Sequence, residues 1–253
     1  ARPPERIVSG HTAHSPLPSL GRLRIRSGSL IFCFMVETPF FDAHTHHLPH
    51  DAQTTAILSC SMAESTSAAF QQARFLSVSL HPWYLSAENL PSQINWMKHC
   101  LSSDSRVVAI GEAGLDKLCD TPFPLQQQAF QTAIDLSEQY HLPLLIHAVK
   151  ATAELLSLQK KHHPAQPWII HGFRGKKELA EDLLRHGFYL SFGKKYQEKA
   201  LSAVPVERLL LESDEENIDF QAFYSEVASV RGTTPESLIK ALHENANRLF
   251  FNR

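Results

Sequence analysis

Eight short apolar segments recur along the chain and alternate with amphipathic ones. This alternation is typical of βα units around a parallel sheet, whose strands are buried on both faces and therefore read as continuous apolar runs. Eight such strands predict an α/β fold, a TIM-type (β/α)8 barrel. The expected strands are 40–46, 56–61, 75–81, 107–112, 144–147, 168–171, 188–192 and 209–214.

The amphipathic segments between these strands predict the outer helices. Only about eight residues separate the first strand from the second, too few for the helix of an ordinary βα unit. We therefore expect the first outer helix to be missing. The expected helices are 63–74, 90–101, 124–140, 151–161, 176–186 and 196–203, with 220–230 and 235–250 closing the chain.

The domain organisation follows from length and local composition. A chain of 253 residues suits one barrel of this kind. Residues 1–34 depart from the pattern, with four prolines, several serines and glycines, and five arginines against a single glutamate. This composition predicts a disordered N-terminal arm, 1–34, followed by a single barrel domain over 35–253 that starts naturally at Met35.

Several classes of protein are disfavoured by composition. No apolar run approaches the roughly 18 residues of a membrane span, and the four cysteines are scattered without a C-x-x-C pair, which disfavours a disulfide framework or a zinc knuckle. We expect a soluble, cytoplasmic monomer. The net charge is −2, or −6 without the arm, so a basic nucleic-acid-binding footprint is missing, although bound cations can supply positive charge locally.

Residues that can bind a metal stand at the ends of many of the expected strands. The C-terminal strand ends form the active-site face of such a barrel. His44 and His46 are two residues apart, a spacing that turns both imidazoles to the same side of a strand. A mixed set of histidines and carboxylates at that face indicates a divalent-metal site. The candidate ligands are His44, His46, Glu112, His147, His171 and Asp214.

The order of these motifs along the chain resembles the TatD-type deoxyribonuclease family. The resemblance runs from Phe40 to Phe250. It is carried by Phe41-Asp42-Ala43-His44-Thr45-His46, Leu80-His81-Pro82-Trp83, Ile110-Gly111-Glu112-Ala113-Gly114-Leu115-Asp116, Leu145-Ile146-His147, Ile170-His171-Gly172-Phe173-Arg174-Gly175, Leu190-Ser191-Phe192, Leu211-Glu212-Ser213-Asp214 and Asn245-Ala246-Asn247-Arg248-Leu249-Phe250.

The resemblance implies a metal-dependent hydrolase with two divalent ions, of zinc, manganese or magnesium. It places His44, His46 and Asp214 on one ion and His147 and His171 on the other, with Glu112 bridging both. It further implies a 3′→5′ exonuclease that acts on single-stranded DNA. Asp214 is the candidate general base, because a ligand carboxylate can accept a proton from water while the metal orients it. The catalytic residues are then Asp214 and Glu112.

Other polar residues near the strand ends are candidates for substrate contacts. The resemblance suggests that His81 touches a phosphate, and Lys150 and Arg174 follow strand ends where an anion would lie. Asp116 either orients a ligand histidine or caps the next segment. Trp83 and Trp168 are expected to be packing residues.

The chain also departs from the family pattern. Ala148-Val149-Lys150 stands where the family has Ser-Arg after the histidine, and the loop after Asp214 is shortened. Two alternatives to a deoxyribonuclease therefore stay open. One is a hydrolase of a small ester or amide, including deacylation of tRNA, and the other is a non-catalytic descendant that binds metal.

Overall fold

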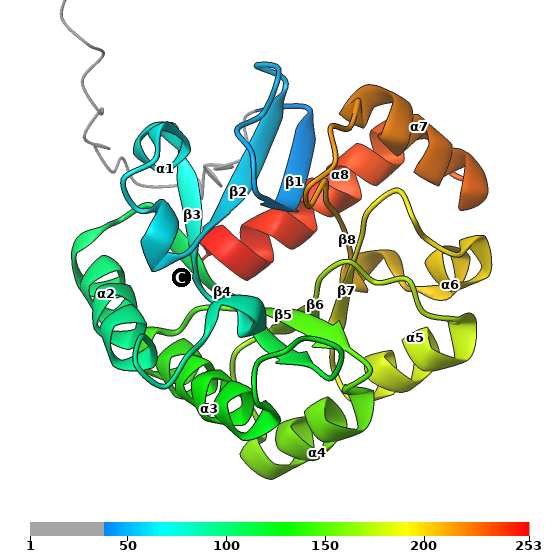
Figure 1. The fold of residues 1–253 in the computed structure, drawn as a ribbon. Coiled ribbons are helices and arrows are strands. Elements are labelled where there is room, and N and C mark those ends of the chain that lie inside the picture. The colour runs from blue at the N-terminus through cyan, green and yellow to red at the C-terminus, as the bar shows by residue number, and fades with distance from the viewer. Residues whose placement is uncertain (1–37, 253) are drawn as a thin grey trace, which may run out of the picture. The chain divides into compact units, whose positions relative to one another are not determined.

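The computed structural model describes residues 38–252, so the predicted arm 1–34 and the start at Met35 lie outside the described residues. The described chain contains an eight-stranded sheet in which neighbouring strands are parallel and follow the order of the sequence. Figure 1 shows the strands at the centre and helices around them. The predicted TIM-type (β/α)8 barrel is confirmed. Its strands are β1 (Phe40–Thr45), β2 (Thr54–Cys60), β3 (Phe75–Leu80), β4 (Val107–Asp116), β5 (Leu144–Val149), β6 (Trp168–Ile170), β7 (Tyr189–Phe192) and β8 (Leu209–Leu211).

Helices follow most of the strands. The α-helices are α1 (Ala68–Gln72), α2 (Leu90–Ser103), α3 (Phe123–Tyr140), α4 (Thr152–His162), α5 (Lys177–Arg185), α6 (Glu198–Ala203), α7 (Phe220–Val230) and α8 (Pro235–Ala246). Short turns of other helix types are η1 (Met62–Glu64), η2 (Pro82–Tyr84), η3 (Val206–Arg208) and η4 (Asn247–Phe251). No described helix is long and apolar enough to cross a membrane.

The first outer helix is missing, as predicted, since no helix lies between β1 and β2. A side chain of helix α7, Tyr224, contacts β1. The Tyr224 hydroxyl donates to the carbonyl oxygen of Phe41 at 3.0 Å and accepts from its backbone nitrogen at 3.2 Å. The Tyr224 ring also packs on Phe40, with centroids 5.1 Å apart. A side chain from α7 thus satisfies two backbone groups of β1 and packs on a neighbouring ring of the same strand.

Two expected helices have different boundaries. The segment 63–74 was predicted as one helix, but η1 and the short α1 occupy it. The reason is local capping: Glu64 accepts from the backbone nitrogen and hydroxyl of Ser61, and Ser67 accepts from Phe70, so a new helix begins at residue 68. The last helix, predicted to reach residue 250, ends at Ala246 and continues as the π-turn η4.

The sheet closes at the strands that carry predicted ligands. Thr45 and Asp214 form a bridge between β1 and the segment that follows β8. The backbone nitrogen of His46 donates to the Asp214 oxygen, and that of Asp214 donates to the His44 oxygen, each at 3.0 Å. Residues far apart in the sequence are therefore held side by side by backbone hydrogen bonds.

A register shift in β1 explains how both histidines point inward. Phe41 and Ala43 belong to the apolar cluster inside the barrel, so strict alternation would turn His44 and His46 outward. The pairing of β1 with β2 shifts between Asp42 and Thr45, and an irregularity of this kind re-aims side chains. As a result, both imidazoles follow Phe41 and Ala43 into the barrel.

Candidate metal centre

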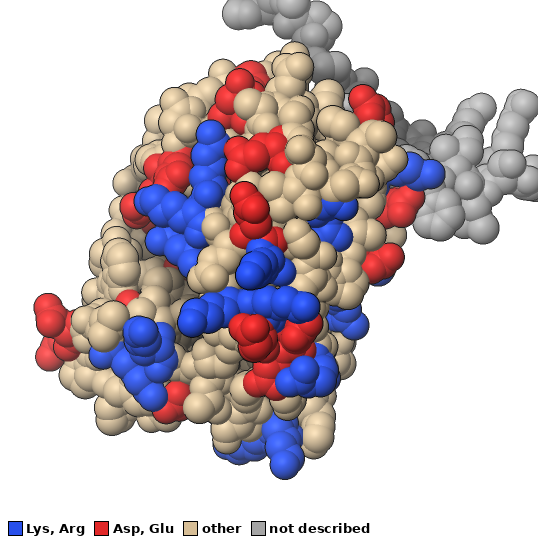
Figure 2. Space-filling view, turned by 90° about the vertical axis from the view of Figure 1, so that its right-hand side faces the viewer, with Lys and Arg blue, Asp and Glu red and all other residues tan. Residues whose placement is uncertain are grey.

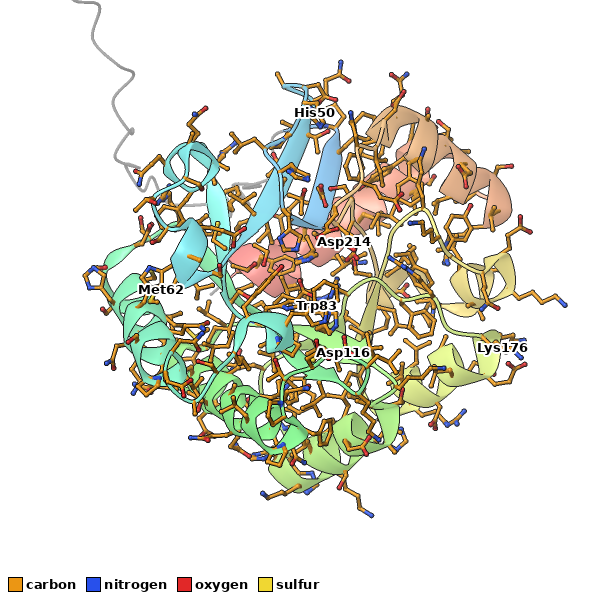
Figure 3. All side chains as sticks on the ribbon, in the orientation of Figure 1. His50, Met62, Trp83, Asp116, Lys176 and Asp214 are labelled. Atoms are coloured by element: carbon orange, nitrogen blue, oxygen red, sulfur yellow. The ribbon has the colours of Figure 1, made fainter. Side chains whose placement is uncertain are left out.

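A cavity of about 920 Å³ opens at the C-terminal ends of the strands. Five of the six predicted ligands line it, and the sixth, His44, is fully buried beside them. Figure 3 shows Asp214, Trp83 and Asp116 over the centre of the ring of elements, whereas Lys176 lies at its edge. The barrel topology therefore gathers ligands from β1, β4, β5 and the segments after β6 and β8.

Glu112 lies at the centre of the cluster, with each carboxylate oxygen facing a different pair of histidines. Its Oε2 atom is 3.3 Å from Nε2 of His44 and 3.3 Å from Nε2 of His46. Its Oε1 atom is 2.6 Å from Nδ1 of His147 and 2.6 Å from Nε2 of His171. One buried carboxylate thus presents an oxygen to each of two groups of donor atoms, as a bridging ligand must.

Asp214 completes the group around the first pair. Its Oδ1 atom is 3.8 Å from Nε2 of both His44 and His46. The residue has a φ of +59°, a left-handed conformation that aspartate tolerates better than most residues and that is often found at functional sites. The strand was expected to continue to residue 214, but β8 ends at Leu211, so the following residues are free to make this turn.

The donor set and its spacing fit a divalent ion. Ligand atoms bound tetrahedrally at about 2.1 Å from one ion lie about 3.4 Å apart, and the distances around Glu112 Oε2 are of that size. The buried Nε2 atom of His44 has no hydrogen-bond partner among the described residues. Three overlapping groups of potential ligands can be drawn: His44–His46–Glu112, His44–His171–Asp214 and His81–Glu112–His147. The division into two ions stays a prediction.

The charge of Glu112 is stabilised by the histidines around it. Burial alone would raise the pKa of Glu112, but His171, His147 and His44 together hold this pKa well below its usual range. Burial lowers the pKa of His44, and the nearby His171 lowers it further, which favours the neutral imidazole that binds metals. The cluster thus combines an ionised carboxylate with a neutral imidazole of the kind that coordinates divalent ions.

His81 lies closer to the cluster than a substrate-binding residue requires. Its Nε2 atom is 3.1 Å from Glu112 Oε1, and the residue is only 6% exposed. Its Nδ1 atom accepts a hydrogen bond from the backbone nitrogen of Trp83. A neutral imidazole with an accepting Nδ1 carries its proton on Nε2. In that tautomer His81 faces the cluster as a hydrogen-bond donor, and its contact to a substrate phosphate stays a prediction.

Two further carboxylates contact the outer sides of the predicted ligands. Asp116 Oδ2 is 3.3 Å from His147 Nε2 and accepts from the Trp83 indole at 2.7 Å, while its Oδ1 accepts from Leu118. Both roles considered for Asp116, orienting a histidine and capping a turn, are therefore combined. Hydrogen-bonded carboxylates behind ligand histidines commonly fix the ring orientation.

Glu212 contacts His171, and no role for Glu212 was predicted from the sequence. Its Oε1 atom accepts from the backbone nitrogen of Gly172 at 2.5 Å and lies 3.4 Å from His171 Nδ1. Burial would raise the pKa of Glu212, but His171 lowers it below the usual value. The available signal was a charged residue directly after the apolar run of β8, where burial without a partner is costly.

The predicted basic residues lie at the rim of the cavity. Lys150 and Arg174 line it, and Arg174 Nη2 is 3.9 Å from Asp214 Oδ2. Lys195, which also follows a strand end where it could meet an anion, lines it too and is paired with Glu216 at 2.7 Å. Figure 2 shows lysines and arginines interleaved with acidic side chains on the face formed by α5, α6 and α7. Arg174 and Lys195 at the rim are thus each placed next to an acidic side chain.

The two tryptophans expected to pack differ from each other. Trp168 is 2% exposed and packs against Phe130 and Phe188, as predicted. Trp83 is 51% exposed and lines the cavity, so the expectation that it is a packing residue was wrong. The turn η2 explains the difference, because it lifts the ring out of the barrel wall.

Comparison with models of protein families identifies the family of this chain. The family model described as TatD related DNase matches residues 40–251. The chain belongs to this family. The match covers all eight strands and every predicted ligand, so the resemblance found in the motifs is confirmed, and the chain is a member of a family of metal-dependent hydrolases.

Individual proteins are similar to this chain over much of their length. The uncharacterized metal-dependent hydrolase YabD of Bacillus subtilis is 32% identical over 177 residues, which cover 61% of this chain and 69% of YabD. A Cronobacter sakazakii protein named 3′-5′ ssDNA/RNA exonuclease TatD is 29% identical over 183 residues, which cover 59% of this chain and 65% of that protein. The crystal structure of the TatD homolog YjjV from Escherichia coli shares the fold, with a TM-score of 0.73 and 23% identity. The match covers 85% of this chain and 99% of YjjV.

Proposed function

We propose that this TatD-family protein hydrolyses phosphodiester bonds at the 3′ end of single-stranded DNA, with two divalent ions held by the six ligands. The observation that carries the proposal is the position of Glu112, whose two oxygens face separate pairs of histidines. The Cronobacter relative, named as an exonuclease on single-stranded DNA and RNA, supports the choice of substrate class.

The side chains around the cluster suit this reaction. Divalent ions held by the six predicted ligands would supply Lewis acidity to the phosphodiester. Asp214 lies at the open side of the cluster, where its carboxylate can accept the proton of the attacking water. Arg174 and Lys150 at the rim can pair with phosphate oxygens, and the Nε2 proton of His81 can be donated to one of them.

The cellular setting is part of the same proposal. The described cysteines, Cys60, Cys100 and Cys119, are free thiols, which suits a reducing cytoplasm; Cys33 lies outside the described part. A monomer is sufficient, because every predicted ligand and rim residue comes from one chain.

A second candidate is hydrolysis of a small ester or amide. Glu64 and Glu215 line the same cavity as the basic residues, and their carboxylates would repel the phosphates of a polynucleotide. A small, weakly charged substrate would avoid that repulsion. The third candidate is a non-catalytic descendant that binds metal at the same centre but hydrolyses no substrate.

Substitution of Asp214 by asparagine tests the proposal. Asp214→Asn keeps the size of the side chain but removes the charge that accepts the proton, so nucleotide release from single-stranded DNA should fall by roughly 10²-fold. The comparison uses saturating metal, with occupancy verified by elemental analysis. Asp182→Asn on α5, whose carboxylate pairs with Arg185 and does not itself line the cavity, is the matched control and should release nucleotide at the wild-type rate.

Assaying the wild-type protein on a panel of substrates separates the three candidates. Release of nucleotides from single-stranded DNA supports the phosphodiesterase. Turnover of small esters alone would favour the second candidate, and bound metal without any turnover would favour the binder. Equal DNA-hydrolysis rates for wild type and Asp214→Asn would refute the assigned role of Asp214.

A further inference from the structure

Exposed aromatic side chains are concentrated at one place on the described surface. The large hydrophobic side chains that stand out as exposed there are Trp83 at 51%, Tyr84 at 59% and Leu118 at 71%. All three lie in the loops that follow β3 and β4, and the two aromatic ones are consecutive residues of η2 that line the cavity. Large apolar groups left open beside a cavity usually mark a binding surface.

The turn that carries the two aromatic residues is firmly anchored. Tyr84 donates its backbone N–H to the His81 oxygen, and its own carbonyl accepts from the side chains of Asn89 and Gln93. The Trp83 indole donates to Asp116 at 2.7 Å. These hydrogen bonds fix the turn in a conformation that exposes both rings. The turn therefore has its conformation before a ligand binds.

The platform, defined as Trp83 and Tyr84, adjoins the metal centre directly. The Trp83 ring is 5.0 Å from the His81 ring and 5.7 Å from the His147 ring, and the Tyr84 ring is 5.3 Å from the His81 ring. Consecutive nucleotides of one strand of duplex DNA advance by about 3.4 Å along the helix axis, and those of an extended single strand lie further apart. A base on the platform would therefore belong to a nucleotide within two steps of a phosphate at the cluster.

Aromatic and basic side chains come from different loops of the rim. The platform follows β3, whereas Lys150, Arg174 and Lys195 follow β5, β6 and β7. A single nucleic-acid strand has the matching two-sided chemistry, with flat bases along one edge and phosphates along the other. Single-strand-binding proteins combine stacking aromatic residues with basic groups along the backbone in this way.

On the basis of the proposed function, we infer that Trp83 and Tyr84 form a stacking platform for an unpaired nucleobase next to the scissile phosphate. Stacking uses a face that every base possesses, so the platform would select single strands without selecting a sequence. A base in a duplex is already stacked on both faces and cannot occupy it. Preference for single strands would then arise from this turn, and hydrolysis from the metal centre.

Binding of two matched oligonucleotides tests the platform. The probes are a five-nucleotide thymidine oligomer and an abasic oligomer of the same length, both with nuclease-resistant phosphorothioate backbones, titrated into metal-loaded protein. Wild type should bind the thymidine oligomer about 10-fold or more tightly than the abasic one. Trp83→Leu combined with Tyr84→Leu should reduce this ratio to near 1.

Two variants distinguish stacking from structural effects. Trp83→Phe keeps an aromatic face but loses the hydrogen bond to Asp116, so it should retain most of the preference for bases. Leu118→Ala removes a neighbouring exposed apolar side chain that does not line the cavity, and should leave the ratio unchanged. Equal binding of both oligomers by wild type, or a loss of preference in Trp83→Phe as complete as in the double leucine variant, would overturn the platform.

Fluorescence and a base-free substrate complete the experiment. Stacking on Trp83 should quench tryptophan emission with the thymidine oligomer and not with the abasic one. Trp83→Phe should abolish this quenching, because the described tryptophans that remain are the partly buried Trp96 and the buried Trp168. Hydrolysis of bis(p-nitrophenyl) phosphate by wild type tests the proposed phosphodiesterase separately. Turnover without a base preference refutes the platform alone, and a base preference without turnover refutes the phosphodiesterase alone.

Discussion

The two ends of the barrel are built from the same strands but serve different purposes. At the end opposite the cavity, Phe41, Phe75 and Val108 pack with Leu249 and Phe250 from the C-terminal segment in one buried apolar cluster. At the cavity end, a few residues further along the same strands, His44 and Glu112 meet in a buried polar cluster. Strand β1 contributes Phe41 to the first cluster and His44 to the second.

The difference shows where stability and function are separated. Burial of apolar side chains stabilises the fold, whereas a carboxylate surrounded by buried histidines costs desolvation energy that bound cations would offset. Function at the strand ends is therefore supported by packing at the opposite ends. If the two ends are independent, a substitution at one end should leave the property supplied by the other end unchanged.

Removing one pair of histidines should have the largest effect, and it should be confined to the cavity end. His147→Ala combined with His171→Ala removes the donor atoms that face Glu112 Oε1, so bound metal should fall from two ions to one per chain. Loss of several kcal/mol of charge stabilisation corresponds to a fall in turnover of about 10³-fold or more. Elemental analysis and single-stranded DNA hydrolysis measure the two effects. Wild-type protein that binds no divalent ion from excess zinc, manganese or magnesium would refute the metal centre itself.

The converse substitution at the apolar end should alter stability alone. Phe250 is 1% exposed and packs on Phe41 with centroids 5.8 Å apart. Phe250→Ala should lower the free energy of unfolding by about 3–5 kcal/mol, because it leaves a cavity in the cluster. Chemical denaturation measures the loss, and Phe251→Ala, at a partly exposed neighbour, should cost less. Loss of bound metal in folded Phe250→Ala would show that the ends are coupled.

A more selective change at the cavity end concerns Glu212. Glu212→Gln keeps the hydrogen bond to Gly172 but replaces the carboxylate that faces His171. Metal affinity should fall by about 10- to 100-fold, the usual effect of losing a carboxylate behind a ligand histidine. Isothermal titration of apo-protein with zinc measures it, with thermal melting of the metal-free form as a control for folding. Unchanged affinity would mean that Gly172 is the only partner that matters.

Sequence reasoning recovered the barrel, the missing first helix and the gathering of the six predicted ligands. Periodicity of apolar residues specifies strands, and the order of the strands then brings their ends together. The split of 63–74 was missed because serine caps compete locally with a helical pattern. Glu212 and the exposure of Trp83 were missed because both depend on contacts with distant residues, namely His171 and Asp116. The role of the arm 1–34 stays a prediction.

The smallest expected effect lies on the outer wall of β1, the strand that links the two ends. Tyr224→Phe removes the hydroxyl that satisfies both the N–H and the C=O of Phe41 while keeping the ring on Phe40. Burying these backbone groups without partners should cost about 1–2 kcal/mol of unfolding free energy. Ser225→Ala on the exposed side of α7 is the matched control, because its hydroxyl bonds only within the helix. If the backbone bridge between Thr45 and Asp214 is enough to hold the ligands of β1 in place, the variant should bind the same number of ions with unchanged affinity. Weaker metal binding in Tyr224→Phe, at a temperature where it is fully folded, would show instead that α7 positions His44 and His46 through the backbone of β1.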